Sequence, residues 1–114
     1  MSAITTHVLD TSRGRPAEGV PVILKIFGAG GKWRIVSRGA TNADGRVPDL
    51  LPKKAKLKRA IYCLTFETAA YYRTLGTVGF YPVVVVTFSI HDAGQHYHVP
   101  LLLSPFGYST YRGS

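Results

Sequence analysis

The chain of 114 residues is poor in cysteine, in acidic residues and in long apolar runs. Its single cysteine, Cys63, cannot form an internal disulfide, which is typical of a protein from a reducing compartment. The longest strongly apolar run, 83–86, falls far short of the roughly 20 residues that a membrane-spanning helix needs. The first residues lack the basic and apolar regions of a signal peptide, and the last three do not form a peroxisomal address. We therefore expect a cytoplasmic protein without a membrane segment, a peroxisomal location staying open for a eukaryotic source.

The scarcity of acidic residues leaves a formal net charge of +8, with 14 Lys and Arg against 6 Asp and Glu. Such a charge alone would favour a nucleic-acid partner. However, five of the fourteen cations lie in the segment 53–59, most others are scattered singly, and no nucleic-acid motif accompanies them. We interpret this segment as a solvated loop and expect no nucleic-acid partner. The positive charge could also attract polyanions or steer a small anionic substrate to the protein, and these alternatives stay open.

Short apolar runs separated by turn signals dominate the chain, a pattern typical of an all-β sandwich. With 46% hydrophobic and 18% charged residues, the whole chain, 1–114, is expected to form a single globular domain. The predicted strands are 4–9, 20–27, 32–39, a short strand that begins at Arg46, 60–67, 81–90, 97–103 and 106–112. The run 83–86 predicts a strand that is covered on both faces. The segment 42–45 predicts a tight turn in which Gly45 takes a positive φ.

One segment, 68–75, changes character and predicts a short helix of about two turns. Thr68 is its expected N-cap residue, and Gly76 is expected just after its end. Tyr71 and Tyr72 are interpreted as packing residues of this helix.

Histidines mark one face of the predicted strand 97–103. Side chains two residues apart on a strand share a face. One face therefore carries His96, His98, Pro100 and Leu102. The other face, which we expect to form the core, carries Tyr97, Val99, Leu101 and Leu103. Because histidine next to proline makes a poor hydrophobic core, the first face is expected to be solvated or buried in an interface.

The same parity applies to the first and last predicted strands. His7 shares a face with Thr5 and Leu9, and Ser109 shares a face with Tyr111. The pattern therefore permits one polar sheet face that carries His7, His98, Ser109 and Tyr111.

Four segments together carry a family resemblance: 5–10 (TTHVLD), 41–46 (TNADGR), 96–104 (HYHVPLLLS) and the ending 108–114 (YSTYRGS). They resemble the 5-hydroxyisourate hydrolases, also called transthyretin-related proteins, and the ending Tyr-Arg-Gly-Ser is the most specific signal. The resemblance implies a transthyretin-like sandwich of two four-stranded sheets with one short helix. It also implies a homotetramer, a dimer of dimers, whose sites lie in a channel between the dimers.

The resemblance further implies the reaction and its residues. Water opens the ring of 5-hydroxyisourate in urate catabolism and gives 2-oxo-4-hydroxy-4-carboxy-5-ureidoimidazoline. The positions that match the family's catalytic residues are His7, Arg46 and His98, and those that match its substrate-binding residues are His7, Arg46, Tyr111 and Ser114. Histidine suits this reaction because a base with a pKa near neutrality helps water to attack. We expect His7 and His98 to handle protons, without assigning which of them is the base.

The reaction needs no metal or other cofactor, and we expect neither. His96 and His98 are two residues apart, but two histidines without a further ligand are a weak zinc signal. His96 and His91 are interpreted as ordinary surface residues. The alternative function is a transthyretin-like carrier that binds a flat aromatic ligand, such as thyroid hormone, in the same channel. A third possibility is an assembly factor that uses the basic segment 53–59.

Overall fold

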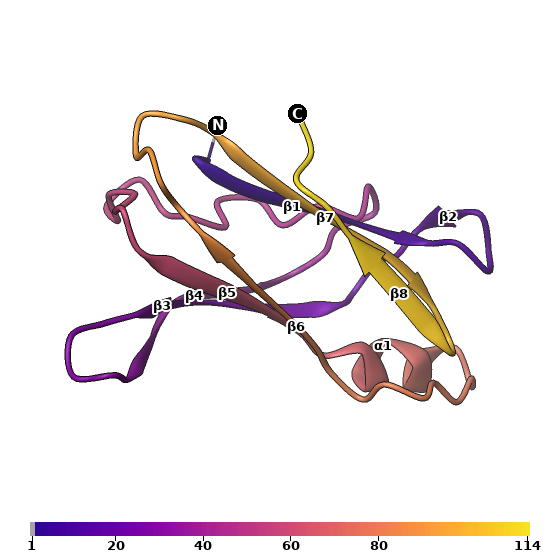
Figure 1. The fold of residues 1–114 in the computed structure, drawn as a ribbon. Coiled ribbons are helices and arrows are strands. Elements are labelled where there is room, and N and C mark those ends of the chain that lie inside the picture. Colours follow the sequence, from indigo (N-terminus) through magenta and orange to yellow (C-terminus); the bar gives the residue numbers. More distant parts are fainter. Residues whose placement is uncertain (1) are drawn as a thin grey trace.

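The structure, a computed structural model, describes residues 2–114. The elements in chain order are β1 (Ile4–Asp10), β2 (Arg15–Pro16), β3 (Pro21–Phe27), β4 (Trp33–Ala40), β5 (Ile61–Phe66), α1 (Thr68–Thr74), β6 (Val84–Ser89), β7 (Tyr97–Ser104) and β8 (Gly107–Thr110). The strands form two four-stranded sheets, ordered β2-β1-β7-β8 and β4-β3-β5-β6, which face each other (Figure 1). The predicted all-β sandwich of two four-stranded sheets with one short helix is confirmed.

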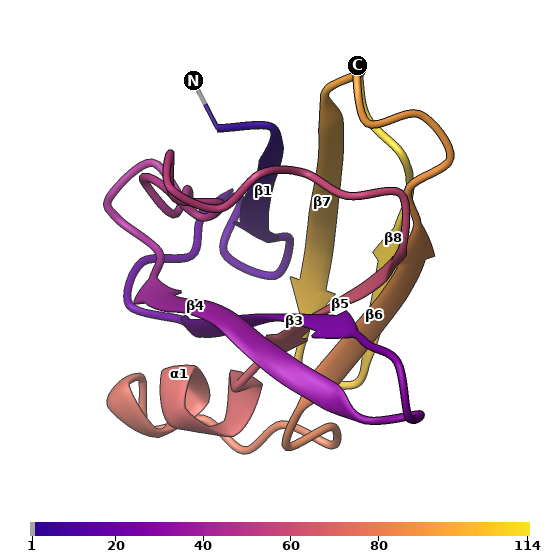
Figure 2. The same ribbon diagram turned by 90° about the vertical axis from the view of Figure 1, so that its left-hand side faces the viewer.

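Burial along β1 and β7 follows the predicted parity. On β1 the side chains of Ile4, Thr6 and Val8 are buried, whereas Thr5 and His7 are only half-buried. On β7 the core face is the predicted one and consists of Tyr97, Val99, Leu101 and Leu103. The two strands are parallel neighbours and run side by side in the views of Figures 1 and 2. Thr5, His7 and His98 therefore lie on the face of the sheet that points away from the core.

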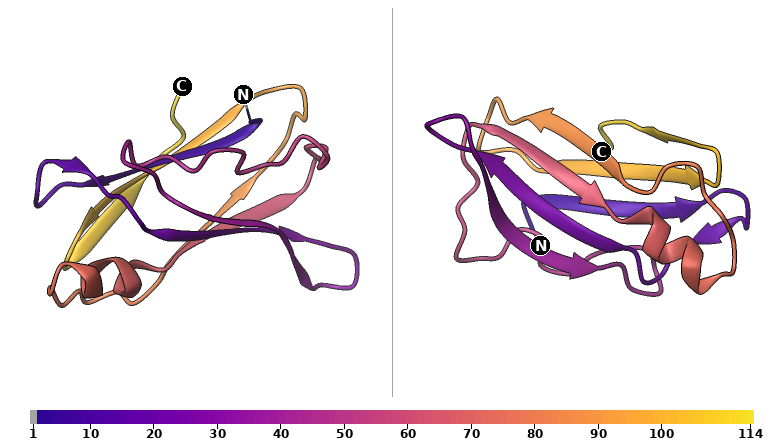
Figure 3. Two further views of the ribbon diagram at one scale, coloured as in Figure 1. Left: turned by 180° about the vertical axis from the view of Figure 1, so that it is seen from behind. Right: turned by 90° about the horizontal axis from the view of Figure 1, so that it is seen from below.

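The helix α1 lies at the end of the sandwich opposite to the two chain termini (Figure 3). It ends at Thr74, one residue before the predicted end, and Gly76 follows it with a φ of 66°, as expected for a residue just past a helix. The predicted N-cap is wrong, because Glu67 occupies that position and Thr68 is the first helical residue. The Thr68 hydroxyl instead donates a hydrogen bond to the Tyr81 carbonyl at 2.5 Å. No helix within residues 2–114 combines the length and the apolar character that crossing a membrane requires.

The strand predicted to begin at Arg46 does not form. Arg46 makes only an isolated antiparallel bridge to His7. The strand that pairs with β1 at the edge of its sheet is instead β2, in a segment for which no strand is predicted. The physical reason is the turn before Arg46. Asn42 takes up both backbone groups of Arg46, accepting from its N–H at 3.1 Å and donating to its carbonyl at 2.8 Å. Pro48 follows soon after and cannot donate to a sheet.

The strand β6 is shorter than predicted and is not covered on both faces. It begins at Val84 instead of Tyr81, and its neighbours Val83 and Val85 are 45% and 50% exposed while Val84 is buried. Side chains of β6 alternate between the core and the outer face of the sandwich, and no third layer covers that outer face at Val85 within residues 2–114. The expectation drawn from the run 83–86 is therefore wrong.

Candidate functional site

A pocket of about 740 Å³ lies over the outward face of β1 and β7. Its lining consists of Ser2, Thr5, Thr6, Asn42, Arg46, Val47, Pro48, Asp49, His96, His98 and Ser114. The structure thus brings together three of the five predicted site residues, which come from a turn, a strand and the end of the chain. His7 and Tyr111 do not line this pocket.

The parallel pairing of β1 and β7 positions His98. Thr5 is directly beside His98 in the register, so the two outward side chains are neighbours. The Thr5 hydroxyl oxygen is 2.8 Å from Nδ1 of His98 and 2.9 Å from Nε2 of His96. The two imidazole rings stack with centroids 6.4 Å apart and an angle of 15° between their planes.

Sequence reasoning missed two members of this cluster. Parity places Thr5 on the correct face but gives it no role. The interpretation of His96 as a surface residue agrees with its exposure but gives it no part in the cluster. The signal that could have found both is the spacing of His96 and His98 on one strand face, combined with a hydroxyl on the neighbouring strand. Among residues 2–114 no group of three or more His, Cys, Asp or Glu side chains has an arrangement suited to a metal.

The surroundings of His98 favour its neutral form. Burial is the largest cause that lowers the pKa of His98 below its ordinary value. The positive charges of Arg46, His96 and His7 lower the pKa further. A neutral imidazole at neutral pH has a nitrogen lone pair that can accept a proton. His98 is therefore able to accept a proton at neutral pH.

Arg46 is placed by a tight turn, as predicted. Gly45 has a φ of 77°, and its N–H donates to the Asn42 carbonyl at 2.9 Å. A Cβ at position 45 would collide with the Val8 carbonyl and come within 3.2 Å of Cδ2 of His7. Glycine thus lets the turn lie directly against β1. The next residue, Arg46, then bridges to His7, so a guanidinium and an imidazole leave the backbone at adjacent positions.

The end of the chain crosses over β7 and closes one side of the pocket. The Gly113 N–H donates to the His98 carbonyl at 2.8 Å. A Cβ on Gly113 would lie 2.6 Å from Cδ2 of His98, so this residue packs directly against the imidazole. Ser114 therefore reaches the lining of the pocket.

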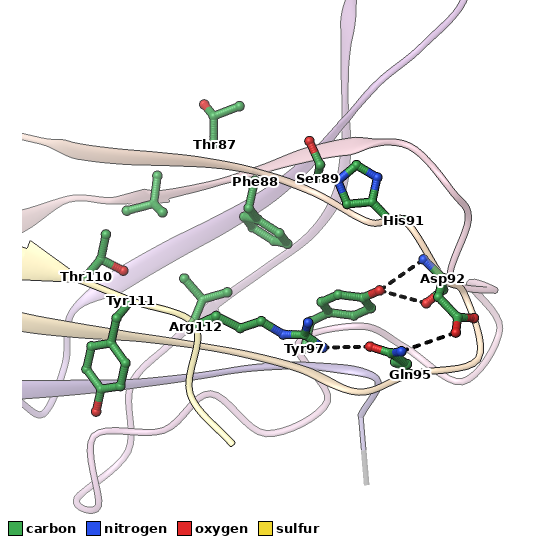
Figure 4. A pocket seen from close by; sticks show the side chains of 12 residues that line it. Thr87, Phe88, Ser89, His91, Asp92, Gln95, Tyr97, Thr110, Tyr111 and Arg112 are labelled. Carbon is green, nitrogen blue, oxygen red and sulfur yellow. Dashed lines mark hydrogen bonds between the residues drawn. The ribbon is translucent and has the colours of Figure 1, made fainter.

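Tyr111 lies apart from His98 within one subunit. The predicted last strand to Arg112 is too long, because β8 ends at Thr110 and the strand parity ends with it. Tyr111 is 57% exposed and lines a second pocket, of about 540 Å³, between the edge strands β6 and β8. In Figure 4 its ring points away from Phe88. Its part in substrate binding stays a prediction.

The sequence and the fold agree on one family. The model of the HIUase/Transthyretin family matches residues 4–113. The chain belongs to this family. The 5-hydroxyisourate hydrolase of Mus musculus is 46% identical over 114 residues, which cover 99% of this chain and 96% of that protein.

Solved structures of both branches of the family share the fold. The 5-hydroxyisourate hydrolase of Klebsiella pneumoniae is 39% identical with a TM-score of 0.84, over 100% of this chain and 94% of that one. Sea bream transthyretin in complex with thyroxine is 31% identical with a TM-score of 0.91, over 97% of this chain and 94% of that one. The fold therefore does not separate an enzyme from a carrier, and the side chains of the site have to decide.

Proposed function

We propose that this chain is a 5-hydroxyisourate hydrolase, which opens the ring of its substrate with water to give 2-oxo-4-hydroxy-4-carboxy-5-ureidoimidazoline. The observation that carries the proposal is His98, a half-buried imidazole with a lowered pKa, next to Arg46 in one pocket. The 46% identity to the mouse hydrolase over nearly the full chain supports the substrate.

In the proposed mechanism His98 or His7 takes a proton from the attacking water. Water is a weak nucleophile at neutral pH, and a positioned base typically accelerates such a step by about 10²–10⁴-fold. A histidine kept neutral by burial and by neighbouring positive charges is ready to accept this proton.

Arg46 binds the substrate oxygens and stabilises the transition state. Its guanidinium offers a planar set of donors that match the oxygens of a urate-like ring. As water adds to the ring carbonyl, negative charge develops on the carbonyl oxygen, and a fixed positive charge there lowers the barrier. Ser114 orients substrate or water through its hydroxyl or its carboxylate.

We further propose that the active protein is a homotetramer, and that neighbouring subunits complete the site. The side chains of Arg46 and Ser114 are exposed within one subunit, so the pocket has no wall on its outer side. β6 and β8 are edge strands of the two sheets, and both border the pocket drawn in Figure 4. Their free edges are available for pairing with another subunit. Paired edges would bury exposed aromatic side chains such as Phe106 and Tyr108, which are 75% and 43% exposed.

A carrier of a flat aromatic ligand is the second candidate, favoured by the TM-score of 0.91 to transthyretin bound to thyroxine. The chemistry of the pocket argues against it. An apolar ligand would leave Nε2 of His98 and the guanidinium of Arg46 without water and without partners, which costs affinity.

The deciding experiment adds the protein to urate and urate oxidase and follows the absorbance of hydroxyisourate. We expect decay well above the spontaneous rate, together with a tetramer in sizing experiments. We expect His98→Asn to abolish most of the acceleration while the tetramer persists. A wild-type tetramer that does not accelerate the decay, but binds thyroxine, would establish the carrier instead.

A further inference from the structure

A single hydroxyl lies between two imidazole nitrogens on the outward face of β1 and β7. The Thr5 oxygen is within hydrogen-bonding distance of both Nδ1 of His98 and Nε2 of His96. A hydroxyl has one proton to donate, but its oxygen can also accept. If both contacts are hydrogen bonds, Thr5 donates to one nitrogen and accepts from the other. One facing nitrogen must then be protonated and the other bare.

This constraint links the protonation of the two rings. In the first arrangement, Nδ1–H of His98 donates to Thr5, and the Thr5 hydroxyl donates to Nε2 of His96. The neutral His98 then has a bare Nε2, which can act as a base. In the second arrangement both hydrogen bonds are reversed, and a neutral His98 carries its proton on Nε2.

We propose that Thr5 is a positioning residue that selects the basic tautomer of His98 and passes a proton between His98 and His96 during hydrolysis. This inference rests on the proposed hydrolase function. In the step, Nε2 of His98 takes a proton from water as the water oxygen bonds to the ring carbonyl. Nδ1 of His98 gives its proton to the Thr5 oxygen, and the Thr5 hydroxyl gives its own proton to Nε2 of His96. One O–H bond of water is broken, one N–H bond on His96 is formed, and His98 stays neutral.

The surroundings of the two rings set the direction of this transfer. His98 is half-buried and His96 is exposed, so the positive charge ends on the ring that water can solvate. Arg46 and His7 disfavour a positive charge on His98. The other charged groups at the pocket are the Asp49 carboxylate and the terminal carboxylate of Ser114. No hydrogen bond to Nε2 of His98 is found within residues 2–114, so this atom is free to meet water or substrate.

The kinetic test compares Thr5→Val, which keeps the shape of the side chain, with Thr5→Ser, which keeps the hydroxyl. We expect valine to lower kcat about 10- to 100-fold, which is part of the total contribution of a general base, and to leave KM unchanged. Serine should restore most of this loss. Thr11→Val is a matched control, because it removes an exposed threonine hydroxyl that bonds to the Leu103 carbonyl at 3.1 Å, away from the pocket. Equal kcat values for the valine and serine variants at position 5 overturn the proposal.

A double-mutant cycle tests whether Thr5 acts through His96. If it does, the double variant Thr5→Val/His96→Gln should have a kcat no lower than that of the slower single variant. The reason is that each substitution alone already removes the same proton transfer. The acidic limb of the pH profile of kcat should shift in the same direction in Thr5→Val and in His96→Gln. If the fold-losses in kcat of the two single variants multiply in the double variant, Thr5 and His96 have independent roles. That result overturns the proposed transfer from Thr5 to His96.

Nitrogen NMR of the imidazole rings gives a readout that does not depend on turnover. At a pH at which imidazoles are neutral, we expect Nδ1 of His98 to be protonated and Nε2 of His96 to be bare, because only this arrangement leaves Nε2 of His98 able to accept a proton. Titration of His96 should move the signals of His98 more in the wild type than in Thr5→Val, in which only the charge of His96 still acts on His98. Three results overturn the proposal even in an active enzyme: facing nitrogens that are both bare, the reverse arrangement with the His98 proton on Nε2, or signals that Thr5→Val leaves unchanged. If the wild-type protein shows the expected protonation of the two nitrogens but does not hydrolyse the substrate, the hydrolase function is refuted. The proton transfer during hydrolysis is then refuted with it.

Discussion

Replacing Gly113 with alanine tests whether the end of the chain holds the imidazole of His98 in place. The added Cβ would lie 2.6 Å from Cδ2 of His98 and 3.3 Å from Cγ of Pro100. An ordinary carbon contact begins near 3.4 Å, so the ring or the chain end has to move by about 0.8 Å, the difference between 3.4 and 2.6 Å. A misplacement of about 1 Å in an active site can cost about 10²-fold in rate.

The effect of this substitution on stability should be much smaller than its effect on turnover. The chain end can lift away with the loss of one hydrogen bond, from the Gly113 N–H to the His98 carbonyl, which contributes about 0.5–1.5 kcal/mol. We therefore expect kcat/KM to fall about 10²-fold while the free energy of unfolding falls by no more than about 1.5 kcal/mol. The absorbance assay measures the first quantity and urea unfolding the second.

Gly107→Ala is the matched control. A Cβ at this position of β8 meets its nearest atom, Oγ of Ser104, at 3.7 Å, so it has room. The control should leave turnover unchanged. If Gly113→Ala retains wild-type kcat/KM, the close packing of the chain end on His98 is not needed for catalysis, and our reasoning fails.

Three further predictions concern groups with perturbed ionisation or unmet hydrogen bonds. Within residues 2–114, the Tyr72 hydroxyl is the one buried side-chain polar atom without a hydrogen-bond partner, and its pKa is raised to about 12, chiefly by burial. Tyr72→Phe should therefore leave the free energy of unfolding, measured by urea titration, unchanged or raise it by up to about 1 kcal/mol. Burial raises the pKa of Asp10, but hydrogen bonds from Tyr71, at 2.6 Å, and from residues 12 and 13 outweigh it, so the net pKa is lowered. The carboxylate therefore stabilises the fold above pH 3.8, and this contribution should be lost as the pH falls through the lower folded pKa; unfolding of Asp10→Asn should lack this acid-dependent loss. Because the pKa of His98 is lowered, the acidic limb of kcat/KM should lie below pH 6.5, and Arg46→Ala, although slow, should move that limb to higher pH.

Strand parity correctly places Thr5, His7 and His98 on the outward faces of β1 and β7, because alternation along a strand is a local property of the chain. The contact between Thr5 and His98 could not be predicted in the same way. It depends on the register of β1 against β7, which joins residues 93 positions apart, and nothing in either segment fixes that register. In the sequence, only the family resemblance connects these distant segments.

The errors of sequence reasoning have local physical causes. The strand predicted at Arg46 fails because the side chain and backbone of Asn42 take up the groups that a strand would use. Tyr111 does not share the face of His98 within one subunit because the chain leaves the sheet after Thr110. The Arg112 guanidinium then donates to Oε1 of Gln95 at 2.9 Å and stacks 4.4 Å from the centre of the Tyr97 ring. Neither tertiary contact is visible in an alternating pattern.

The same alternation explains how one fold can serve a hydrolase and a hormone carrier. On β1 and β7 the inward residues, such as Val8 and Leu101, pack the core, and the outward residues, such as Thr5 and His98, do not. Substitutions on the outward face therefore create no cavity in the core and leave the backbone pairing of the two strands intact. The side-chain chemistry of this face can therefore change with little effect on stability. Turnover and unfolding free energy should accordingly respond independently to substitutions on the two faces of the same strand.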